Sequence, residues 1–146
     1  MTKTNIKIRK GAKVFIVEDN EERLNWFREK MPHVTIWDEK DPETVIDRFR
    51  EMPPDMFDAI FLDFDLGPGN IKNSTINSIP VVDFLNSRLT SRRSQRNIVI
   101  HSANGPGAFW MNTMLPGATR LPFGEFDIEE VGNVALTRAF GELLAL

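Results

Sequence analysis

The sequence has no cysteine, only two histidines and no apolar run long enough to span a membrane. The absence of cysteine excludes disulfide bonds, cysteine-ligated zinc and a cysteine nucleophile. The two histidines, His33 and His101, leave little room for a histidine-rich metal site. The four basic residues within residues 1–10 are not followed by the apolar core of a secretory signal. We therefore expect a cytoplasmic protein that does not bind membranes.

Charge and composition are those of one globular domain. The formal net charge of −3 gives no general electrostatic drive toward nucleic acid or anionic membrane. Hydrophobic residues make up 41% and charged residues 27% of the 146 positions, which suits a single folded domain with its own core. We expect residues 1–12 to form a polar, basic tail and residues 13–146 to form the domain.

Short apolar runs alternate with helical patterns along the domain. Short apolar runs predict strands at residues 14–17, 34–37, 59–62 and 98–100, and the short segment 118–123 is expected to be a fifth strand. Predicted helices between and after them carry these apolar positions: Leu24, Phe27 and Met31; Val45, Ile46 and Phe49; Val81, Val82, Leu85 and Leu89; Trp110, Met111 and Met114; and, over residues 127–146, Ile128, Val131, Leu136, Phe140 and Leu143. This alternation predicts an α/β fold with a doubly wound, five-stranded parallel sheet and helices on both faces.

Acidic side chains follow two of the predicted strands, at the edge where such sheets bind ligands. Glu18 and Asp19 follow the first strand, and Asp63 follows the third, with Asp65 two residues later. Carboxylates gathered at one edge repel each other without a cation, and hard oxygen ligands suit Mg²⁺ or Mn²⁺. We therefore predict a Mg²⁺ or Mn²⁺ site formed by Glu18, Asp19 and Asp63, although Glu18 and Asp19 also suit helix capping.

The fourth predicted strand ends in His101. A lone histidine on an apolar strand is more often a core residue, but this position at the strand end makes His101 a candidate general acid or base. Asp63 and Asp65 are the further catalytic candidates. Asp65 either orients His101 or completes the metal's ligands, and it also suits a turn.

A phosphate-binding segment is predicted directly after His101. Ser102, Asn104 and the backbone amides of Gly105 and Gly107, at the start of a helix, are suited to bind phosphate oxygens. The Gly-, Pro-, Asn- and Ser-containing residues 67–78 predict a long loop that covers the substrate.

Four arginines cluster near the end of the third predicted helix: Arg88, Arg92, Arg93 and Arg96. The simplest interpretation is a solvated face that complements the helix dipole, and an RNA contact is the alternative.

The chain from Lys13 onward resembles the receiver domain of two-component response regulators. Glu18 and Asp19 look like a receiver's metal-binding acidic pair, and Asp63 looks like its phospho-accepting aspartate. Ser102 stands where receivers carry a hydroxyl, whereas Leu121 replaces the lysine of the receiver's Lys-Pro-Phe. The resemblance implies a receiver-like, flavodoxin-like fold with strand order 2-1-3-4-5.

A closer resemblance is to the cyclic-phosphate processing receiver domains. It is carried by residues 62–67, residues 101–108 and Met111. In that family the strand motif is usually Leu-Asp-His-Asp-Leu, so Phe64 replaces a histidine. The family is proposed to act on cyclic or terminal phosphates in RNA repair or nucleotide signalling, sometimes in phage genomes. The resemblance implies a metal-dependent phosphohydrolase whose partner is a phosphate-containing nucleotide or RNA end.

Two other functions stay open. Leu121 favours an inactive receiver-like module that binds a partner, dimerises or signals, with helix four and strand five as the face for a homodimer or partner protein. The spacing of Asp63 and Asp65 is also that of haloacid-dehalogenase phosphatases, which use the first aspartate as nucleophile and the second as acid/base. Those enzymes carry the motif on their first strand, whereas two strands precede it here.

Overall fold

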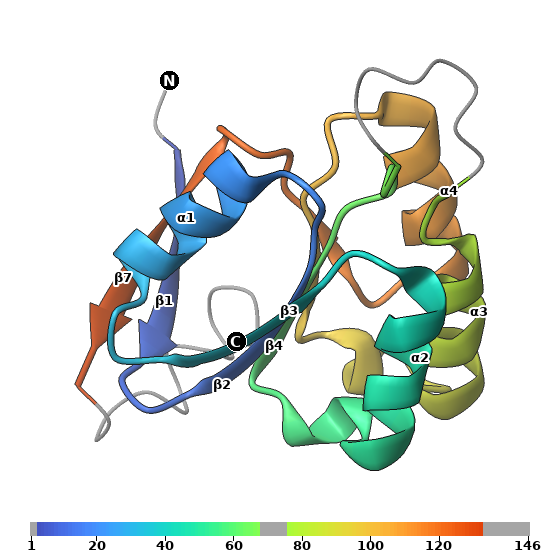
Figure 1. Ribbon diagram of the computed structural model, residues 1–146, viewed down its shortest axis with the longest axis horizontal. Coiled ribbons are helices and arrows are strands. Elements are labelled where there is room, and N and C mark those ends of the chain that lie inside the picture. The colour runs from blue at the N-terminus through green and yellow to red at the C-terminus, as the bar shows by residue number, and fades with distance from the viewer. Residues whose placement is uncertain (1–2, 68–75, 133–146) are drawn as a thin grey trace.

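Strands and helices alternate through residues 3–67 and 76–132, the part of the chain that the computed structural model describes (Figure 1). The strands are β1 (Thr4–Arg9), β2 (Lys13–Val17), β3 (Thr35–Glu39), β4 (Ala59–Leu62), β5 (Ile98–Ile100), β6 (Thr119–Arg120) and β7 (Phe126–Val131). The helices are α1 (Glu21–Lys30), α2 (Pro42–Glu51), α3 (Ile79–Arg88) and α4 (Gly105–Met114), with short 3-10 turns η1 (Pro54–Met56) and η2 (Arg93–Gln95). No helix in these two ranges has the length and apolar character needed to cross a membrane.

Five strands form one parallel sheet in the order β3-β2-β4-β5-β6. Numbered from β2 as the first strand of this sheet, the order is 2-1-3-4-5, which confirms the predicted fold. The last strand, β6, has two residues and is shorter than predicted. Pro122 follows it closely and has no N–H to donate to a strand ladder.

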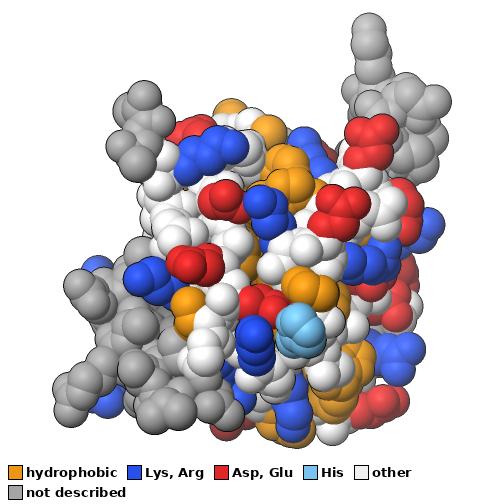
Figure 2. Space-filling model, turned by 90° about the vertical axis from the view of Figure 1, so that its left-hand side faces the viewer, with side chains coloured by type: hydrophobic (Ala, Val, Ile, Leu, Met, Phe, Trp, Pro, Cys, Tyr) orange, Lys and Arg blue, Asp and Glu red, His pale blue; other side chains and the backbone are white. Residues whose placement is uncertain are grey.

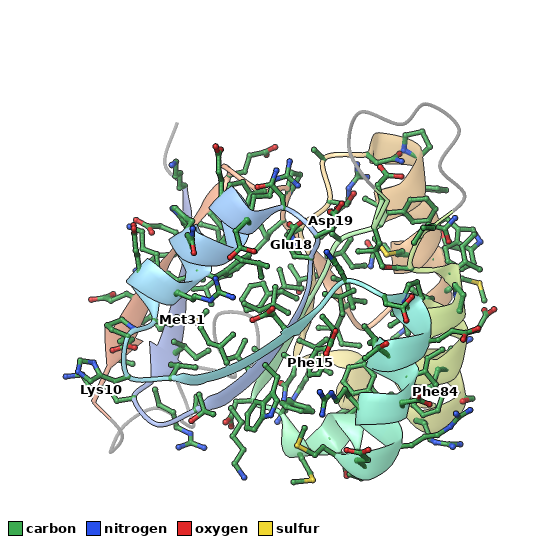
Figure 3. All side chains as sticks on the ribbon, viewed as in Figure 1. Lys10, Phe15, Glu18, Asp19, Met31 and Phe84 are labelled. Atoms are coloured by element: carbon green, nitrogen blue, oxygen red, sulfur yellow. The ribbon has the colours of Figure 1, made fainter. Side chains whose placement is uncertain are left out.

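Helices cover both faces of this sheet because neighbouring residues on a strand point to opposite sides. On β2, Phe15 belongs to the core under α2, α3 and α4, whereas Ile16 packs with Phe27 and Met31 on the α1 side. Phe15 and Met31 mark these two cores in Figure 3. With apolar contacts on both faces, the central strands are buried along their length, which explains their continuous apolar sequence.

The two ends of the described chain form a second sheet, which the sequence analysis did not predict. β1 and β7 pair in parallel, with Thr4 opposite Phe126 and Arg9 opposite Val131, and they lie beside α1 (Figure 1). Residues 4–9 were expected in an irregular tail, and residues 126–131 at the start of a helix. The helix prediction is wrong for this stretch, and residues 133–146 lie outside the described part of the chain.

The physical reason is a period of two in both segments. Ile6 and Ile8 alternate with polar residues on β1, and Phe126 and Ile128 do so on β7, and all four side chains are buried in the α1-side core. Strict alternation is typical of a half-buried strand. A lone strand leaves its backbone N–H and C=O groups unpaired, so each segment needs the other.

Candidate functional site

Three carboxylates meet at the carboxyl end of the main sheet. Val17 on β2 is paired with Leu62 on β4, so the residues that follow, Glu18 and Asp63, leave the sheet side by side. One oxygen from each of Glu18, Asp19 and Asp63 lies within 4.8 Å of the others. Glu18 and Asp19 are labelled at this end of the sheet in Figure 3, just before α1 begins. The structure thus brings together the three residues predicted to hold a metal.

Backbone and side-chain donors hold the two buried carboxylates. The Oε2 atom of Glu18 accepts hydrogen bonds from the amides of Asp19 at 3.1 Å and Asn20 at 3.2 Å. The Oδ1 atom of Asp63 accepts the amide of Phe64 at 2.9 Å. Both carboxylates therefore have a fixed orientation toward each other.

Burial makes negative charge unfavourable at these positions. It raises the pKa of Asp63 to about 7, against the opposing effects of His101 and the hydroxyl of Ser102, and the nearby charge of Glu18 raises it further. Burial likewise raises the pKa of the Glu18 carboxyl above its ordinary value. Without an added cation, the pair is therefore most stable when it retains a proton.

His101 lies behind these carboxylates, on the α1 side of the sheet. Its ring is fully buried, with the edges of Phe27 and Phe61 against it, and its Nε2 atom is 2.9 Å from Oε1 of Glu18. Burial lowers the pKa of His101 to about 4, so the ring is neutral near pH 7. Its Nδ1 atom is buried without a hydrogen-bond partner among the described residues. The structure therefore does not place His101 where it was predicted to act, against the substrate, because no part of the ring reaches the surface.

An open pocket of about 500 Å³ lies in front of the carboxylates. Asp19 and Asp63 form part of its wall, and Asp65, Ser102 and Asn104 form another part. Asn104 joins this second group together, because its side-chain Nδ2 atom donates to Oδ2 of Asp65 at 3.0 Å and its backbone N–H donates to the Ser102 hydroxyl at 3.1 Å. Asp65 is thus fixed by Asn104 and not by His101, and it is outside the three-carboxylate cluster.

The two glycines predicted to bind phosphate differ in their surroundings. The amide of Gly107 donates to Oδ1 of Asn104 at 3.0 Å, so the Asn104 side chain caps α4. A Cβ atom at Gly107 would lie 2.5 Å from Cγ of Phe64, so this glycine admits the Phe64 ring against the start of α4. The amide of Gly105 has no acceptor among the described residues, which leaves it as the free donor of the pair.

Arg23 on α1 is a pocket residue that the sequence analysis missed. Its Nη1 atom lies 3.6 Å from Oε1 of Glu18 and 3.9 Å from Oδ2 of Asp63, and its guanidinium lies over the ring of Phe123 at 5.2 Å. It is the one cation among the described residues that line the pocket. Its place in the first turn of a predicted helix could have indicated this position, because helical side chains point back toward the N-terminus, and here the N-terminus of the helix lies at the carboxylates.

The position of the receiver lysine contributes no charge to this site. Leu121 is half-buried and packs with the α1-side core. The cation beside Asp63 is instead Arg23 on α1, which comes much earlier in the sequence than Leu121.

Comparison with solved structures shows a receiver-like fold. The receiver domain of a putative LuxO repressor protein from Vibrio parahaemolyticus is 17% identical, with a TM-score of 0.53 over 92% of this chain and 91% of that one. The response regulator domain of Thermotoga maritima CheB is 14% identical, with a TM-score of 0.52 over 93% and 98%. NtrX from Brucella abortus is 14% identical, with a TM-score of 0.55, and this chain covers 28% of its length.

A comparison with curated proteins gives no match. A comparison with protein families matches residues 14–117 to the cyclic-phosphate processing receiver domain. This match covers more than half of the chain and includes the carboxylates, His101 and the start of α4. The chain therefore belongs to the cyclic-phosphate processing receiver domain family.

Proposed function

We propose that this protein is a metal-dependent phosphohydrolase that acts on a cyclic or terminal phosphate of RNA or of a nucleotide. The observation that carries the proposal is the cluster of Glu18, Asp19 and Asp63, three carboxylates within 4.8 Å at the wall of an open pocket. Two of them are buried, which is costly for carboxylates unless a cation or proton compensates them.

The cluster fits Mg²⁺ or Mn²⁺. All three groups offer oxygen atoms, which these hard cations prefer, and the neighbouring pocket leaves room for water and a phosphate oxygen. When bound there, such a cation polarises a phosphate oxygen and lowers the pKa of a coordinated water. Ion binding would also replace the proton that the Glu18 and Asp63 pair retains.

The opposite wall supplies groups that bind phosphate. We assign the Ser102 hydroxyl, the Asn104 side chain and the free amide of Gly105 to contacts with its oxygens. Arg23 provides the one positive charge among the described residues that line this acidic pocket, and its guanidinium has the geometry to bind two phosphate oxygens. Gly107 supports this wall through its close contact with Phe64 rather than through its amide.

Asp65 is the group placed to move a proton. It is exposed at the pocket, outside the carboxylate cluster, and Asn104 fixes its orientation. In hydrolysis of a 2′,3′-cyclic phosphate, the oxygen of water forms a bond to phosphorus and one ribose P–O bond breaks. Asp65 accepts a proton from the water and returns it to the ribose oxygen as that oxygen leaves, so the product is a phosphomonoester. His101 acts through Glu18 as a positioning residue.

The test is turnover by the purified protein with Mg²⁺ or Mn²⁺ and a panel of substrates. The panel contains 2′,3′-cyclic nucleotides, RNA with cyclic or terminal phosphates, and cyclic dinucleotides. We expect turnover that requires the metal, that Asp63→Asn abolishes, and that Asp65→Asn lowers by about 10²–10⁴-fold as expected for loss of an acid–base group. Metal-independent turnover, or full activity of Asp63→Asn, would refute the proposal.

A second candidate is a receiver-derived module that binds nucleotides without turnover. The observation that favours it is the burial of His101, which leaves no histidine among the described residues of the pocket. Tight binding of a cyclic nucleotide in the presence of metal, with no product across the panel, would establish this function instead.

A further inference from the structure

One segment of the chain has no acidic residue. Between Asp83 and Glu125 the sequence contains five arginines and neither aspartate nor glutamate, although the whole protein has a net charge of −3. The five are Arg88, Arg92, Arg93, Arg96 and Arg120. The segment comprises the second half of α3, η2, β5, α4 and β6. The distribution of charge is therefore strongly asymmetric: this part of the molecule is basic, although the whole protein is acidic.

Within the described part of the chain, these arginines also lack acidic partners. Among the residues that the structure describes, none of the five makes an ion pair, whereas Arg9, Arg28 and Lys30 on other elements do. On the face that carries α1, β1 and β7, Figure 2 shows acidic and basic side chains intermixed. The charge of the acid-free segment is therefore available to an external anion.

The loop that carries three of the arginines is held rigidly. The side chain of the buried Gln95 donates to the carbonyl of Leu89 at 2.9 Å and accepts the amide of Gly117 at 2.9 Å. Ser91 and Ser94 exchange hydrogen bonds across the turn. A Cβ atom at Gly117 would lie 2.0 Å from the carbonyl oxygen of Arg92, so the chain after α4 is pressed against this loop. A loop backbone held in place in this way loses little conformational entropy when a ligand binds.

α4 connects this loop to the pocket. The helix begins beside the pocket, where Nη2 of Arg120 approaches the Cβ position of Gly105 to 3.8 Å, and the chain that follows it contacts Arg92. Its ten residues span about 15 Å. The exposed residues Phe109 and Thr113 on α4 are uncharged, and 67% of the Phe109 surface is exposed.

We propose that this face, defined as Arg120, Phe109 and the loop of Arg92, Arg93 and Arg96, binds a single strand of RNA whose end enters the pocket. Guanidinium groups bind the phosphates of the strand, and the Phe109 ring stacks on a base, which is the combination that single-stranded nucleic acids require. The inference rests on the proposed function and specifies its substrate class as RNA ends rather than free nucleotides.

The test is fluorescence anisotropy with a labelled single-stranded oligoribonucleotide that ends in a 2′,3′-cyclic phosphate, measured over a range of salt concentrations. The double variant Arg92→Glu/Arg93→Glu changes the net charge from −3 to −7. Lys7→Glu/Lys10→Glu, at exposed positions in and just after β1, makes the same change and is the matched control. We expect the arginine variant to bind RNA at least tenfold more weakly, with the slope of log K against log salt reduced by about 1.4, and the lysine variant to keep the wild-type slope.

Two further measurements separate this inference from the proposed function. Phe109→Ala should weaken RNA binding by about 5- to 100-fold. Binding of a 2′,3′-cyclic mononucleotide with Mn²⁺ should be equal in the wild type and in Arg92→Glu/Arg93→Glu. If the mononucleotide does not bind but RNA binding still depends on the arginines, the pocket required by the proposed function fails, whereas the RNA-binding role of the arginine face is supported. The inference would be overturned if the arginine and lysine variants lost RNA affinity equally. It would also be overturned if the wild type were a dimer and Phe109→Ala converted it to a monomer without affecting RNA binding.

Discussion

The Nε2 atom of His101 lies 2.9 Å from Oε1 of Glu18, and both side chains are completely buried. Burial keeps the imidazole neutral at pH 7, and the hydrogen bond between its Nε2 atom and Oε1 holds the Glu18 carboxyl in place beside Asp63. His101 is therefore part of the support of the carboxylate cluster rather than part of the pocket surface.

Replacement of His101 tests this relationship. His101→Ala leaves the Glu18 carboxylate buried with one partner fewer, so we expect the free energy of unfolding to fall by about 2–5 kcal/mol. His101→Gln retains an N–H donor and should recover part of the loss. Denaturant unfolding measures both variants. If His101→Ala kept wild-type stability and affected only the rate of turnover, the histidine would have to reach the substrate, in contrast to this structure.

The affinity for metal should depend on pH through Asp63. Its pKa is raised from 3.8 to about 7, so the site gains its full negative charge only as the pH rises through 7. We expect the apparent Mn²⁺ affinity to increase by about tenfold per pH unit below pH 7 and to level off above it. Isothermal titration calorimetry at pH 5.5 to 8.5 in the wild type measures this change. A flat profile would contradict the raised pKa.

The same raised pKa predicts that the metal-free protein is destabilised by its own carboxylate. The folded state binds the Asp63 proton more tightly than the unfolded state, so stability decreases as the pH rises from about 3.8 to about 7. Asp63→Asn removes this charge, and we expect it to be more stable than the wild type at pH 8 by about 1–4 kcal/mol without metal. Thermal unfolding should show that the difference disappears near pH 4, and excess Mn²⁺ at pH 8 should stabilise the wild type alone.

Replacement of Arg23 should change the affinities for Mn²⁺ and for a 2′,3′-cyclic nucleotide in opposite directions. It lies within 4 Å of both buried carboxylates, so Arg23→Ala removes a competing cation and should raise Mn²⁺ affinity by up to about fivefold. The same variant should weaken binding of a 2′,3′-cyclic nucleotide by about tenfold or more, because a charge-assisted hydrogen bond to phosphate is lost. Calorimetric titrations measure each ligand separately. If Arg23→Ala lowered the affinities for Mn²⁺ and for the nucleotide alike, Arg23 would stabilise the fold of the site rather than bind phosphate.

The contact between Gly107 and Phe64 can be tested by a double-mutant cycle. Gly107→Ala places a Cβ atom 2.5 Å from Cγ of Phe64, so we expect a loss of about 1–3 kcal/mol of stability. In a Phe64→Ala background the same change should cost much less. Gly132→Ala, where a Cβ atom has no neighbour within 4 Å among the described residues, serves as the control and should be nearly neutral. An equal cost of Gly107→Ala in both backgrounds would show that the two residues are not coupled.

The main sheet was predictable because each of its central strands is a short, continuous apolar run. Burial on both faces requires this pattern, as in Phe15 and Ile16 on β2, and the acidic residues that follow such runs must leave the sheet at one edge. The positions of Glu18, Asp19 and Asp63 therefore followed from local sequence and the rule for parallel sheets. The pairing of β1 with β7 did not, because Thr4 and Phe126 are more than 120 residues apart and neither short segment specifies its partner.

The sequence by itself determined the five parallel strands and the edge at which the carboxylates gather, because these depend on local periodicity and on the chirality of parallel connections, whereas the strand order came from the resemblance to receiver domains. Only the tertiary structure decided which polar groups face the pocket. His101 and Ser102 are adjacent in the chain, yet the histidine points into the α1-side core and the serine lines the pocket, since successive side chains leave a strand in opposite directions. Arg23 reaches Asp63 through the packing of α1 across the end of β2 and β4, a contact between residues 40 positions apart that no local pattern contains.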